Sequence, residues 1–282
     1  MRLLSYNDGR AGQLLGDGRV VPLADSMRTV IDRWAQDGTL SVPASDDATA
    51  LRDIALRLPV PNPSKIIAAP VNYRDHQLEM KVDAQVGALG FFLKAPSSLL
   101  DPGGTIQLPY HDRRFDQEGE LAVVIGRTAR NVAEHRALEY IFGYTGLLDI
   151  TMRGGEDRST RKSFDTFTPM GPVLVTADEF GDPGDVELRC RVNGELRQKA
   201  NTRDLIWNVP KLISYASSVT TLHPGDIVTT GTPAGVGQIN AGDEIRLELF
   251  GLGLPLTARV AADNAVTCPT SGHNRGANGP AS

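Results

Sequence analysis

The chain has 282 residues, of which 40% are hydrophobic and 22% charged, and its formal net charge is −5. This composition is ordinary for a globular protein and allows one large domain with a small appendage. The sequence has no basic cluster and no apolar run of about 18 residues, so we expect neither nucleic acid nor a membrane as a partner. Cys190 and Cys268 form no CxxC pair, and the first ten residues lack a signal-peptide pattern, which favours a reducing cytoplasm.

Residues 1–60 are predicted to form a small N-terminal α/β unit. It begins with short strands separated by two Asp-Gly turns, at Asp8-Gly9 and Asp17-Gly18. A helix is then predicted, with Asp25 or Ser26 as its N-cap, because apolar residues recur at helical spacing: Met27, Val30, Ile31 and Trp34.

A second helix is predicted over residues 46–58, again from apolar residues on one face: Leu51, Ile54, Ala55 and Leu58. The proline-rich segment that follows, residues 59–63, favours a linker.

The segment from residue 64 to residue 262 is dominated by short apolar strands with Gly and Pro turns between them. Strands are expected at 64–70, 90–94, 105–109, 120–126, 171–176, 186–194, 225–231, 243–251 and 254–260. Helical patterns are few, at 132–144 and 205–222. Many strands with few crossovers favour a β-rich α+β fold over a doubly wound one. The last residues, 266–282, are polar and are expected to form a loose, disordered tail.

A histidine and a glutamate in "NYRDHQLEM" share a face if residues 73–80 form a helical turn, because His76 and Glu79 are three positions apart. A carboxylate beside an imidazole orients the ring and raises its basicity, as a general base requires. The alternative is an incidental ion pair on a surface helix.

In "GFFLKAPSSL", Lys94 ends an apolar strand, where it either reaches a substrate carboxylate or extends to solvent.

Three acids lie inside apolar stretches, where a carboxylate is costly: Glu118, Glu120 and Asp149. Because side chains of a strand alternate with a period of two, Glu118 and Glu120 point to the same side. Two like charges at such a short distance repel each other unless a cation lies between them. Oxygen ligands suit Mg²⁺ or Mn²⁺. The alternative is a solvated strand face.

Two further segments have the composition of binding loops. The stretch from 149 to 172 contains a cluster of charged residues: Asp149, Arg153, Glu156, Arg161 and Lys162. Arginine offers a planar fork for a carboxylate, and lysine a point charge for an oxyanion. In "PGDIVTTGTPAGVG", glycines allow backbone N–H groups to approach a ligand, and Thr232 adds a hydroxyl. The alternatives are a solvated charged loop and a plain turn.

Together, in this order, these motifs resemble the fumarylacetoacetate hydrolase family. The matching segments are "NYRDH..EM", "FLKAPSS", "EGELAVVIG", "GYTGLLDIT.R", "KSFDTFTPMGP", "RVNGE", "NT" and "TTGTPAGVG", spread from about Lys65 to Val260. The resemblance implies a mixed β-sandwich roll with the active site at one end of a barrel-like core, preceded here by the small N-terminal unit. It also implies a homodimer and a bound Mg²⁺, Mn²⁺ or Ca²⁺.

The resemblance also implies roles for individual residues. The acid trio matches the metal ligands of the family, and His76 with Glu79 matches a dyad on a mobile lid. The remaining matches concern substrate and charge: Lys162 precedes the "FDT" turn, Arg153 follows the metal-binding aspartate by four residues, and Thr232 with Gly231 lies in the loop that receives a keto-acid carboxylate.

The chain departs from the family pattern at two places. Pro70 and Val71 precede Asn72 where many relatives have a glycine, which changes the expected lid hinge. Glu156 stands where glutamine is common, which removes a hydrogen-bond donor to substrate. Both departures bear on the substrate more than on the chemistry.

We therefore expect a metal-dependent hydrolase that cleaves a carbon–carbon bond in a short 2,4-diketo acid, of acylpyruvate or fumarylpyruvate type, and releases pyruvate. The same residues allow an oxaloacetate-type decarboxylase or an isomerase of the 2-hydroxyhepta-2,4-diene-1,7-dioate type. A protein that binds a keto acid without catalysis is the third alternative. The sequence does not identify the group beyond C4 of the substrate.

Overall fold

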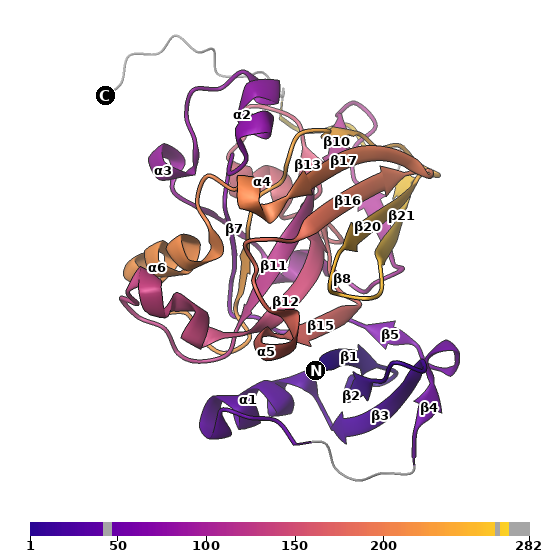
Figure 1. The fold of residues 1–282 in the computed structure, drawn as a ribbon. Coiled ribbons are helices and arrows are strands. Elements are labelled where there is room, and N and C mark those ends of the chain that lie inside the picture. Colours follow the sequence, from indigo (N-terminus) through magenta and orange to yellow (C-terminus); the bar gives the residue numbers. More distant parts are fainter. Residues whose placement is uncertain (42–46, 263–265, 271–282) are drawn as a thin grey trace.

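A computed structural model describes residues 1–41, 47–262 and 266–270 of the chain (Figure 1). Its largest feature is a mixed sheet of 11 strands. In spatial order the strands are β4 (Thr49–Ala50), β3 (Arg19–Ala24), β2 (Arg10–Leu14), β1 (Arg2–Tyr6), β15 (Val173–Thr176), β12 (Ile141–Leu148), β11 (Gly119–Ile125), β18 (Ile227–Thr229), β6 (Ile66–Ala68) and β7 (Phe92–Lys94), with β5 (Leu56–Arg57) also paired to β1.

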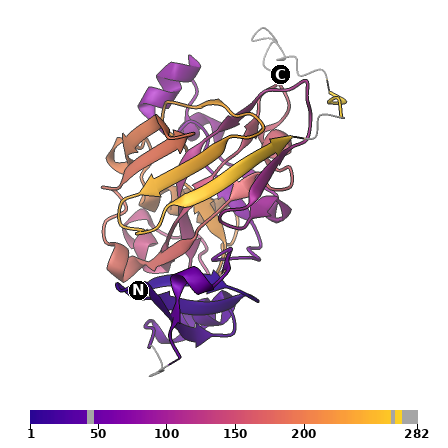
Figure 2. The ribbon, with the colours of Figure 1, turned by 90° about the vertical axis from the view of Figure 1, so that its right-hand side faces the viewer.

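A second sheet of 5 strands packs against the first, and Figure 2 shows it crossing the face turned to the viewer. Its order is β17 (Glu195–Asn201), β16 (Glu187–Val192), β20 (Glu244–Leu249), β21 (Leu256–Ala262) and β9 (Thr105–Leu108). Two small sheets complete the strands: β13 (Thr151–Met152), β10 (Phe115–Gln117) and β19 (Gly237–Gln238), then β14 (Thr168–Pro169) and β8 (Leu99–Leu100).

The helices are short and lie around the sheets. They are α1 (Met27–Asp37), α2 (Arg74–Met80), α3 (Val86–Leu89), α4 (Arg158–Lys162), α5 (Ala177–Phe180) and α6 (Val209–Val219), with 3₁₀ turns η1 (Leu51–Asp53), η2 (Pro96–Ser98), η3 (Glu134–Tyr140) and η4 (Thr202–Asp204). The strand-rich α+β fold expected from the sequence is confirmed. Among the described helices, none has the length and apolarity needed to span a membrane.

Strand β11 shows how the apolar sequence builds two cores. Every residue of β11 is buried. Leu121 and Val123 contribute to the core between the two large sheets, whereas Ala122 and Val124 contribute to a second core shared with the N-terminal unit. Because alternate side chains of a strand point to opposite faces, one continuous apolar run fills both cores and fixes β11 at the centre of the fold.

The N-terminal unit, coloured indigo at the bottom of Figure 1, extends the main sheet and is not a separate sheet. Strand β1 pairs antiparallel with β15, with Leu3 opposite Leu174. Helix α1 forms as predicted, with the Ser26 side chain accepting a hydrogen bond from the Thr29 amide and Gly38 ending the helix in a left-handed conformation. The unit therefore supports the sheet that carries the acids. Its boundary near residue 60 stays a prediction.

The predicted helix over residues 46–58 is wrong. The described part of that segment, from residue 47, instead forms strand β4, the turn η1 and strand β5. Strand β4 pairs with β3, and strand β5 pairs with β1. Leu51, Ile54 and Leu56 pack against a small cluster of Leu4, Tyr6 and Val20. Backbone pairing with two strand edges was available only in the folded protein, and it outweighed a helical spacing of apolar residues.

Two further expectations need correction. The helical pattern at 132–144 becomes the 3₁₀ turn η3 followed by strand β12. The loose tail expected from residue 266 is wrong for residues 266–270, since the Cys268 amide donates a 2.9 Å hydrogen bond to Asp112 and the Val266 carbonyl accepts one of 3.2 Å from His111. Residues 271–282 lie outside the described part of the chain.

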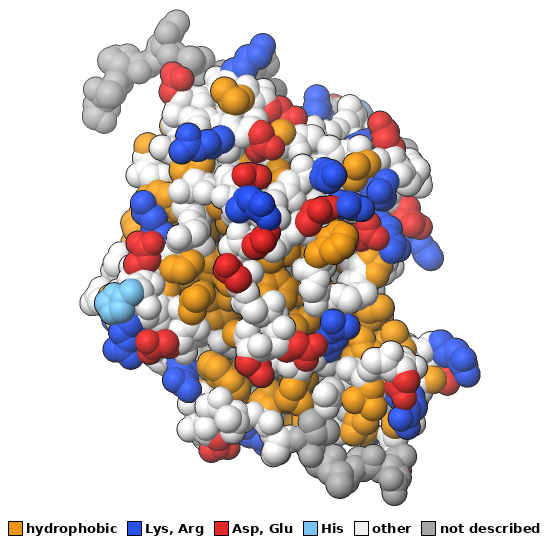
Figure 3. All heavy atoms as spheres, viewed as in Figure 1, with side chains coloured by type: hydrophobic (Ala, Val, Ile, Leu, Met, Phe, Trp, Pro, Cys, Tyr) orange, Lys and Arg blue, Asp and Glu red, His pale blue; other side chains and the backbone are white. Residues whose placement is uncertain are grey.

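The surface in Figure 3, seen as in Figure 1, shows hydrophobic side chains gathered in the middle and lower part of this face, with acidic and basic side chains interspersed around them.

Candidate functional site

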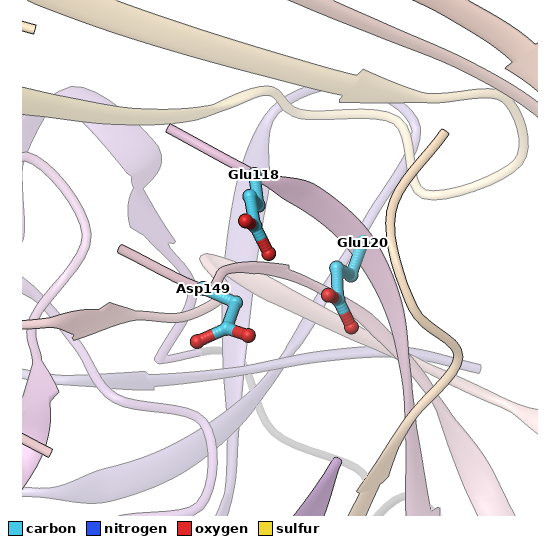
Figure 4. Close-up of side chains that lie close together, drawn as sticks. All are labelled: Glu118, Glu120 and Asp149. Carbon is cyan, nitrogen blue, oxygen red and sulfur yellow. The ribbon is translucent and has the colours of Figure 1, made fainter. Parts of the chain in front are cut away.

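Glu118, Glu120 and Asp149 are brought together at one end of the central strands. Glu118 lies between β10 and β11, Glu120 lies in β11, and Asp149 follows β12 directly. The Asp149 amide donates a 2.8 Å hydrogen bond to the Glu118 carbonyl, which holds the two strand ends in register. All three side chains are buried, each offers an oxygen within 4.8 Å of the others, and Figure 4 shows them pointing into one shared space.

Lys162 is the cation that bridges two members of the acid trio. Its ammonium group donates to Glu118 at 2.7 Å, to Asp149 at 2.6 Å and to the Thr151 hydroxyl at 2.7 Å. A lysine ammonium has three donors, so these hydrogen bonds use all of them. Although burial alone would lower it, the acids Asp149 and Glu118 raise the pKa of Lys162. Lys162 is therefore charged and fixed in place.

Lys94 lies behind Asp149 and not in the wall of the cavity described below. It is 1% exposed, and its ammonium group donates to Asp149 at 2.5 Å and to the Phe167 carbonyl at 3.2 Å. The alternative in which Lys94 extends to solvent is wrong, because the strand end is covered on all sides. The geometry gives no support to direct contact between Lys94 and a substrate either, and it assigns this lysine to holding Asp149.

Arg153 links the trio to a fourth acid. Its Nε donates to Asp116 at 2.5 Å and its Nη2 donates to Glu118 at 3.1 Å. A guanidinium has five donors, so Arg153 keeps donors free for a ligand. Asp116, Glu118 and Glu120 follow each other at a period of two in "FDQEGE", and this spacing could have indicated Asp116 from the sequence.

Glu120 differs from the other two acids, because no Lys or Arg lies within ion-pair distance of it in the described chain. Its Oε2 accepts a 2.9 Å hydrogen bond from the Gly231 amide. Burial, reinforced by the charge of Asp149, raises the pKa of Glu120 to about 8. Burial acts on Glu118 too, but there the cations of Lys162 and Arg153 prevail and lower the pKa to about 2. The trio thus holds one carboxyl group that lacks a balancing charge.

This donor set fits a hard divalent cation. Three carboxylates can supply only oxygen ligands, the type that Mg²⁺, Mn²⁺ and Ca²⁺ prefer. A buried carboxylate without a cationic partner is costly unless it binds a proton or a metal ion. Glu118, Glu120 and Asp149 are therefore the residues that would hold the metal.

The His76–Glu79 pair predicted from the sequence forms on helix α2. His76 Nδ1 lies 3.1 Å from Glu79 Oε2, and the His76 ring is buried. Glu79 Oε1 accepts a 2.9 Å hydrogen bond from the Gly235 amide, so the helix is tied to the glycine-rich loop. If Nδ1 donates to Glu79, Nε2 of His76 is left as an acceptor, which is the state that a general base needs.

A cavity of about 320 Å³ connects these groups. The predicted site residues that line it are His76, Glu118, Glu120, Asp149, Arg153, Lys162 and Thr232. Glu79, Lys94 and Gly231 do not line it and contact the lining residues from behind. The volume is in the range expected for a small-molecule site.

The glycine-rich loop serves the protein's own acids. The amide hydrogens of Gly231 and Gly235 go to Glu120 and Glu79, and the Thr232 hydroxyl donates to the Gly119 carbonyl at 3.0 Å. The predicted role of Gly231 in binding a substrate carboxylate therefore has no support in this geometry. Thr232 remains in the cavity wall, where it has an acceptor lone pair beyond its bond from Gln198.

The two departures from the family pattern have structural consequences. Glu156 turns away from the cavity and pairs with Arg113 at 2.8 Å.

Val71 lines the cavity with φ of 46°, a left-handed conformation that a β-branched residue rarely adopts. Asn72, the next residue, anchors the chain just before helix α2: its side chain donates to the carbonyls of Trp207 and Thr230 at 2.9 and 2.8 Å. Sequence reasoning did not single out the role of Asn72.

Comparison with known proteins gives consistent results. The family model "Fumarylacetoacetate (FAA) hydrolase C-terminal" matches residues 65–261. A maleylpyruvate hydrolase of Aquipseudomonas alcaligenes is 49% identical over 214 residues, which cover 72% of this chain and 75% of that protein. A mitochondrial oxaloacetate tautomerase of Xenopus laevis is 40% identical over 214 residues, 71% of this chain and 67% of that protein.

A similar fold is present in a solved structure, the maleylpyruvate hydrolase from Sphingobium sp. SYK-6 in complex with manganese (II) ion and pyruvate. It has a TM-score of 0.79 and 38% sequence identity, and the match covers 93% of this chain and 99% of that one.

Proposed function

This chain belongs to the fumarylacetoacetate hydrolase family, and we propose that it is a divalent-metal-dependent hydrolase. Its substrate is a short 2,4-diketo acid, which it cleaves at the C3–C4 bond to release pyruvate and a carboxylic acid. The similarity to maleylpyruvate hydrolases supports this reaction class, and so does the manganese ion and pyruvate in a relative's crystal.

One observation carries the choice of hydrolysis: an imidazole paired with a carboxylate, His76 with Glu79, lines the same cavity as the acid trio. His76 is oriented by Glu79, and Glu79 is held by the Gly235 amide. Hydrolysis needs a base that takes a proton from water, whereas moving a proton within the substrate does not. A positioned general base contributes typically about 10²- to 10⁴-fold to the rate.

The metal ion in this proposal is Mg²⁺ or Mn²⁺, with Ca²⁺ as a further candidate, held by Glu118, Glu120 and Asp149. When bound, such an ion acts as a Lewis acid that polarises the keto group of the substrate and makes C3 a better leaving carbon. Every other part of the proposed mechanism belongs to side chains of the protein.

His76 Nε2 takes a proton from a water molecule, and the water oxygen attacks the C4 carbonyl. The C3–C4 bond then breaks, the electron pair stays on the pyruvyl fragment, and the other fragment leaves as a carboxylic acid. The protonated His76 returns its proton to C3, which completes pyruvate and restores the base. Glu79 stabilises the protonated imidazole through the 3.1 Å contact to Nδ1. Helix α2 covers the cavity from one side and limits the entry of bulk water.

Arg153 and Lys162 act by charge in this mechanism. Arg153 has free donors beside the acid trio and binds the C1 carboxylate of the substrate. Lys162 has no free donor, so it balances the negative charge that develops on the pyruvyl fragment and keeps Glu118 and Asp149 in position. Lys94 supports Asp149 from behind.

A substrate panel tests the proposal. Purified protein with Mn²⁺ or Mg²⁺ is incubated with an acylpyruvate, with oxaloacetate and with an unsaturated 2-keto diacid, and pyruvate and the second product are measured together. We expect pyruvate and a carboxylic acid in equal amounts from the acylpyruvate. Release of carbon dioxide from oxaloacetate, with the acylpyruvate left intact, would contradict the hydrolase.

Proton transfer is the second candidate, because a relative is named an oxaloacetate tautomerase. A decarboxylase needs no base that activates water, so that activity would survive loss of His76. A tautomerase or isomerase also needs no water-activating base, but it needs a side chain that carries a proton between substrate atoms. A silent keto-acid-binding protein would instead bind pyruvate and turn over none of the panel.

A homodimer and a cytoplasmic location stay predictions, which size-exclusion chromatography and cell fractionation would test.

A further inference from the structure

A pair of oppositely charged side chains holds the loop that connects Arg153 to helix α4. Arg113, which lies just before β10, donates through Nη1 and Nη2 to the two carboxylate oxygens of Glu156, at 2.9 and 2.8 Å. The two side chains are 6% and 12% exposed, so solvent ions screen the pair little. Two parallel hydrogen bonds between arginine and a carboxylate fix orientation as well as distance.

The same guanidinium reaches the backbone of Arg153. Arg113 Nη2 also donates to the Arg153 carbonyl at 3.0 Å, and the Arg153 amide donates to the Arg114 carbonyl at 2.8 Å. The N–H and the C=O of Arg153 are therefore both tied to the segment that leads into β10. A side chain that starts from a fixed backbone has less freedom to shift, and here that side chain is the guanidinium beside Glu118.

Gly154 allows the ion pair to pack against the loop. A Cβ at this position would lie 2.1 Å from both Arg113 Nη2 and Glu156 Oε2. This distance is far below van der Waals contact, so a side chain at residue 154 would push the pair away from the backbone that it holds.

Residues 266–270 cover the ion pair from the outside. The Thr270 hydroxyl donates to Glu156 Oε1 at 2.5 Å, and Cys268 Sγ lies 3.1 Å from Arg113 Nη1. The hydrogen bonds from Arg113 and Thr270 lower the pKa of Glu156 to about 2, so this carboxylate is charged at neutral pH. The covering segment lies beyond the part of the chain that matches the family model.

We propose that Arg113, Glu156 and Thr270 form a clamp that positions Arg153 for the carboxylate of the substrate. The role of Arg153 in this inference rests on the proposed function. Neither Arg113 nor Glu156 lines the cavity, so they act through the backbone of Arg153 and not by touching substrate. Arg113 is therefore a positioning residue, and the glutamate that stands where relatives often have glutamine supplies its partner.

Pyruvate binding tests the clamp without turnover. The Mn²⁺-loaded protein is titrated with pyruvate, and binding is followed by the paramagnetic broadening of the pyruvate methyl signal. Arg113→Gln should weaken pyruvate binding about tenfold, because the Arg153 guanidinium loses its fixed position. The affinity for Mn²⁺ should stay within about threefold of wild type. An unchanged affinity for pyruvate in Arg113→Gln would overturn the proposal.

A double-variant cycle separates positioning from a general loss of structure. Arg113→Gln should weaken pyruvate binding in the wild-type background and have no further effect in an Arg153→Gln background, because the clamp acts through Arg153. The same loss of affinity in both backgrounds would mean that Arg113 acts on the fold as a whole, which contradicts the proposal.

Gly154→Ala opens the clamp without removing a charge, so it should weaken pyruvate binding as Arg113→Gln does. Two controls match these variants. Gly16→Ala adds a methyl group that meets nothing within 4 Å, and Arg136→Gln removes an exposed arginine that pairs with Glu139 at 2.8 Å. Both controls should bind pyruvate as wild type does, and a loss of affinity in them equal to that in Arg113→Gln would count against the clamp.

Thr270→Val tests the part that the covering segment contributes. Removing this hydroxyl takes one hydrogen bond from Glu156, so pyruvate binding should weaken by about two- to fivefold. Thr267→Val is the control from the same segment, because the Thr267 hydroxyl contacts His111 instead, at 3.0 Å. Equal pyruvate affinities for the two threonine variants would remove Thr270 from the clamp.

Cleavage assays separate this inference from the proposed function. With an acylpyruvate, Arg113→Gln should raise KM more than it lowers kcat. If the acylpyruvate is not cleaved but pyruvate binding responds to Arg113→Gln only when Arg153 is present, the hydrolase proposal fails and the clamp stands. If the acylpyruvate is cleaved and Arg113→Gln keeps the wild-type KM, the hydrolase stands and the clamp fails. Wild-type protein that binds no pyruvate would overturn both.

Discussion

The Gly235 amide donates a 2.9 Å hydrogen bond to Glu79, across 156 positions of the chain. This bond joins the glycine-rich loop to helix α2 and places the glutamate against His76. The loop therefore orients the proposed base and does not bind substrate through this amide.

Gly235→Ala should impair catalysis because the added Cβ would lie 1.9 Å from the Arg197 carbonyl oxygen, at a residue with φ of 94°. The loop must move, and the bond to Glu79 is lost. We expect kcat to fall at least tenfold and the free energy of unfolding to fall by about 1–3 kcal/mol.

Gly242→Ala is the matched control for this substitution. Gly242 has φ of 93°, but its Cβ would meet nothing within 4 Å. It should lose stability through backbone strain alone and keep its kcat. Equal kcat values for the two variants, measured by pyruvate release, would remove the proposed role of the loop.

His76→Ala should lower kcat for an acylpyruvate by about 10²- to 10⁴-fold, because water loses its base. The affinity for Mn²⁺, measured by calorimetry, should stay unchanged, since His76 is not one of the three acids. His135→Ala, at an exposed histidine, is the control for loss of an imidazole. Weaker Mn²⁺ binding in His76→Ala would argue that the ring belongs to the metal site.

Lys94→Met should lower the stability of the folded protein more than it changes the binding of substrate. Removing this fully buried ammonium leaves Asp149 with one ion pair fewer, and breaking a buried pair costs about 3–5 kcal/mol. Urea unfolding should show a loss of this order, and Lys199→Met, at an exposed lysine, should show none. A raised KM with unchanged stability would instead restore the prediction that Lys94 contacts the substrate.

The stability of the metal-free protein should depend on pH through Glu120. Its pKa rises from 4.5 to about 8 on folding, so between these values the folded state binds more protons than the unfolded chain. The free energy of unfolding therefore falls as the pH rises from about 5 to 8. Glu118 acts in a separate window, because its lowered pKa of about 2 stabilises the protein above pH 4.5 and loses that effect as the pH falls.

Urea unfolding in chelator at pH 5, 6, 7 and 8 checks this dependence. Glu120→Gln should flatten the decline, and Mn²⁺ should restore stability most at the higher pH, where all three acids are free to bind it. A decline that is identical in wild type and Glu120→Gln would place its origin elsewhere.

Much of the fold and the centre of the site could be predicted from short-range patterns. A period of two placed Glu118 and Glu120 on one side of a strand, and a spacing of three placed His76 beside Glu79. Apolar runs bounded by Gly and Pro located the main strands. These features depend on neighbours in sequence, and a sequence displays them directly.

The rest depends on contacts between distant segments. Lys94 and Asp149 are 55 positions apart, and nothing in either motif indicates that they pair. The predicted helix at 46–58 failed because its competitor was an edge of the sheet formed by β1 and β3. The free donors of Arg153 and the occupied donors of Lys162 could be assigned only once their partners were known.

The most direct test of the account is the metal dependence of pyruvate release from an acylpyruvate. Protein freed of metal with a chelator and then dialysed should show no turnover, and activity should return in proportion to Mn²⁺ bound, up to one ion per chain. Glu118→Ala should not recover under the same titration while keeping its fold by circular dichroism. Undiminished turnover after complete metal removal would contradict the central claim that the three acids work by holding a cation.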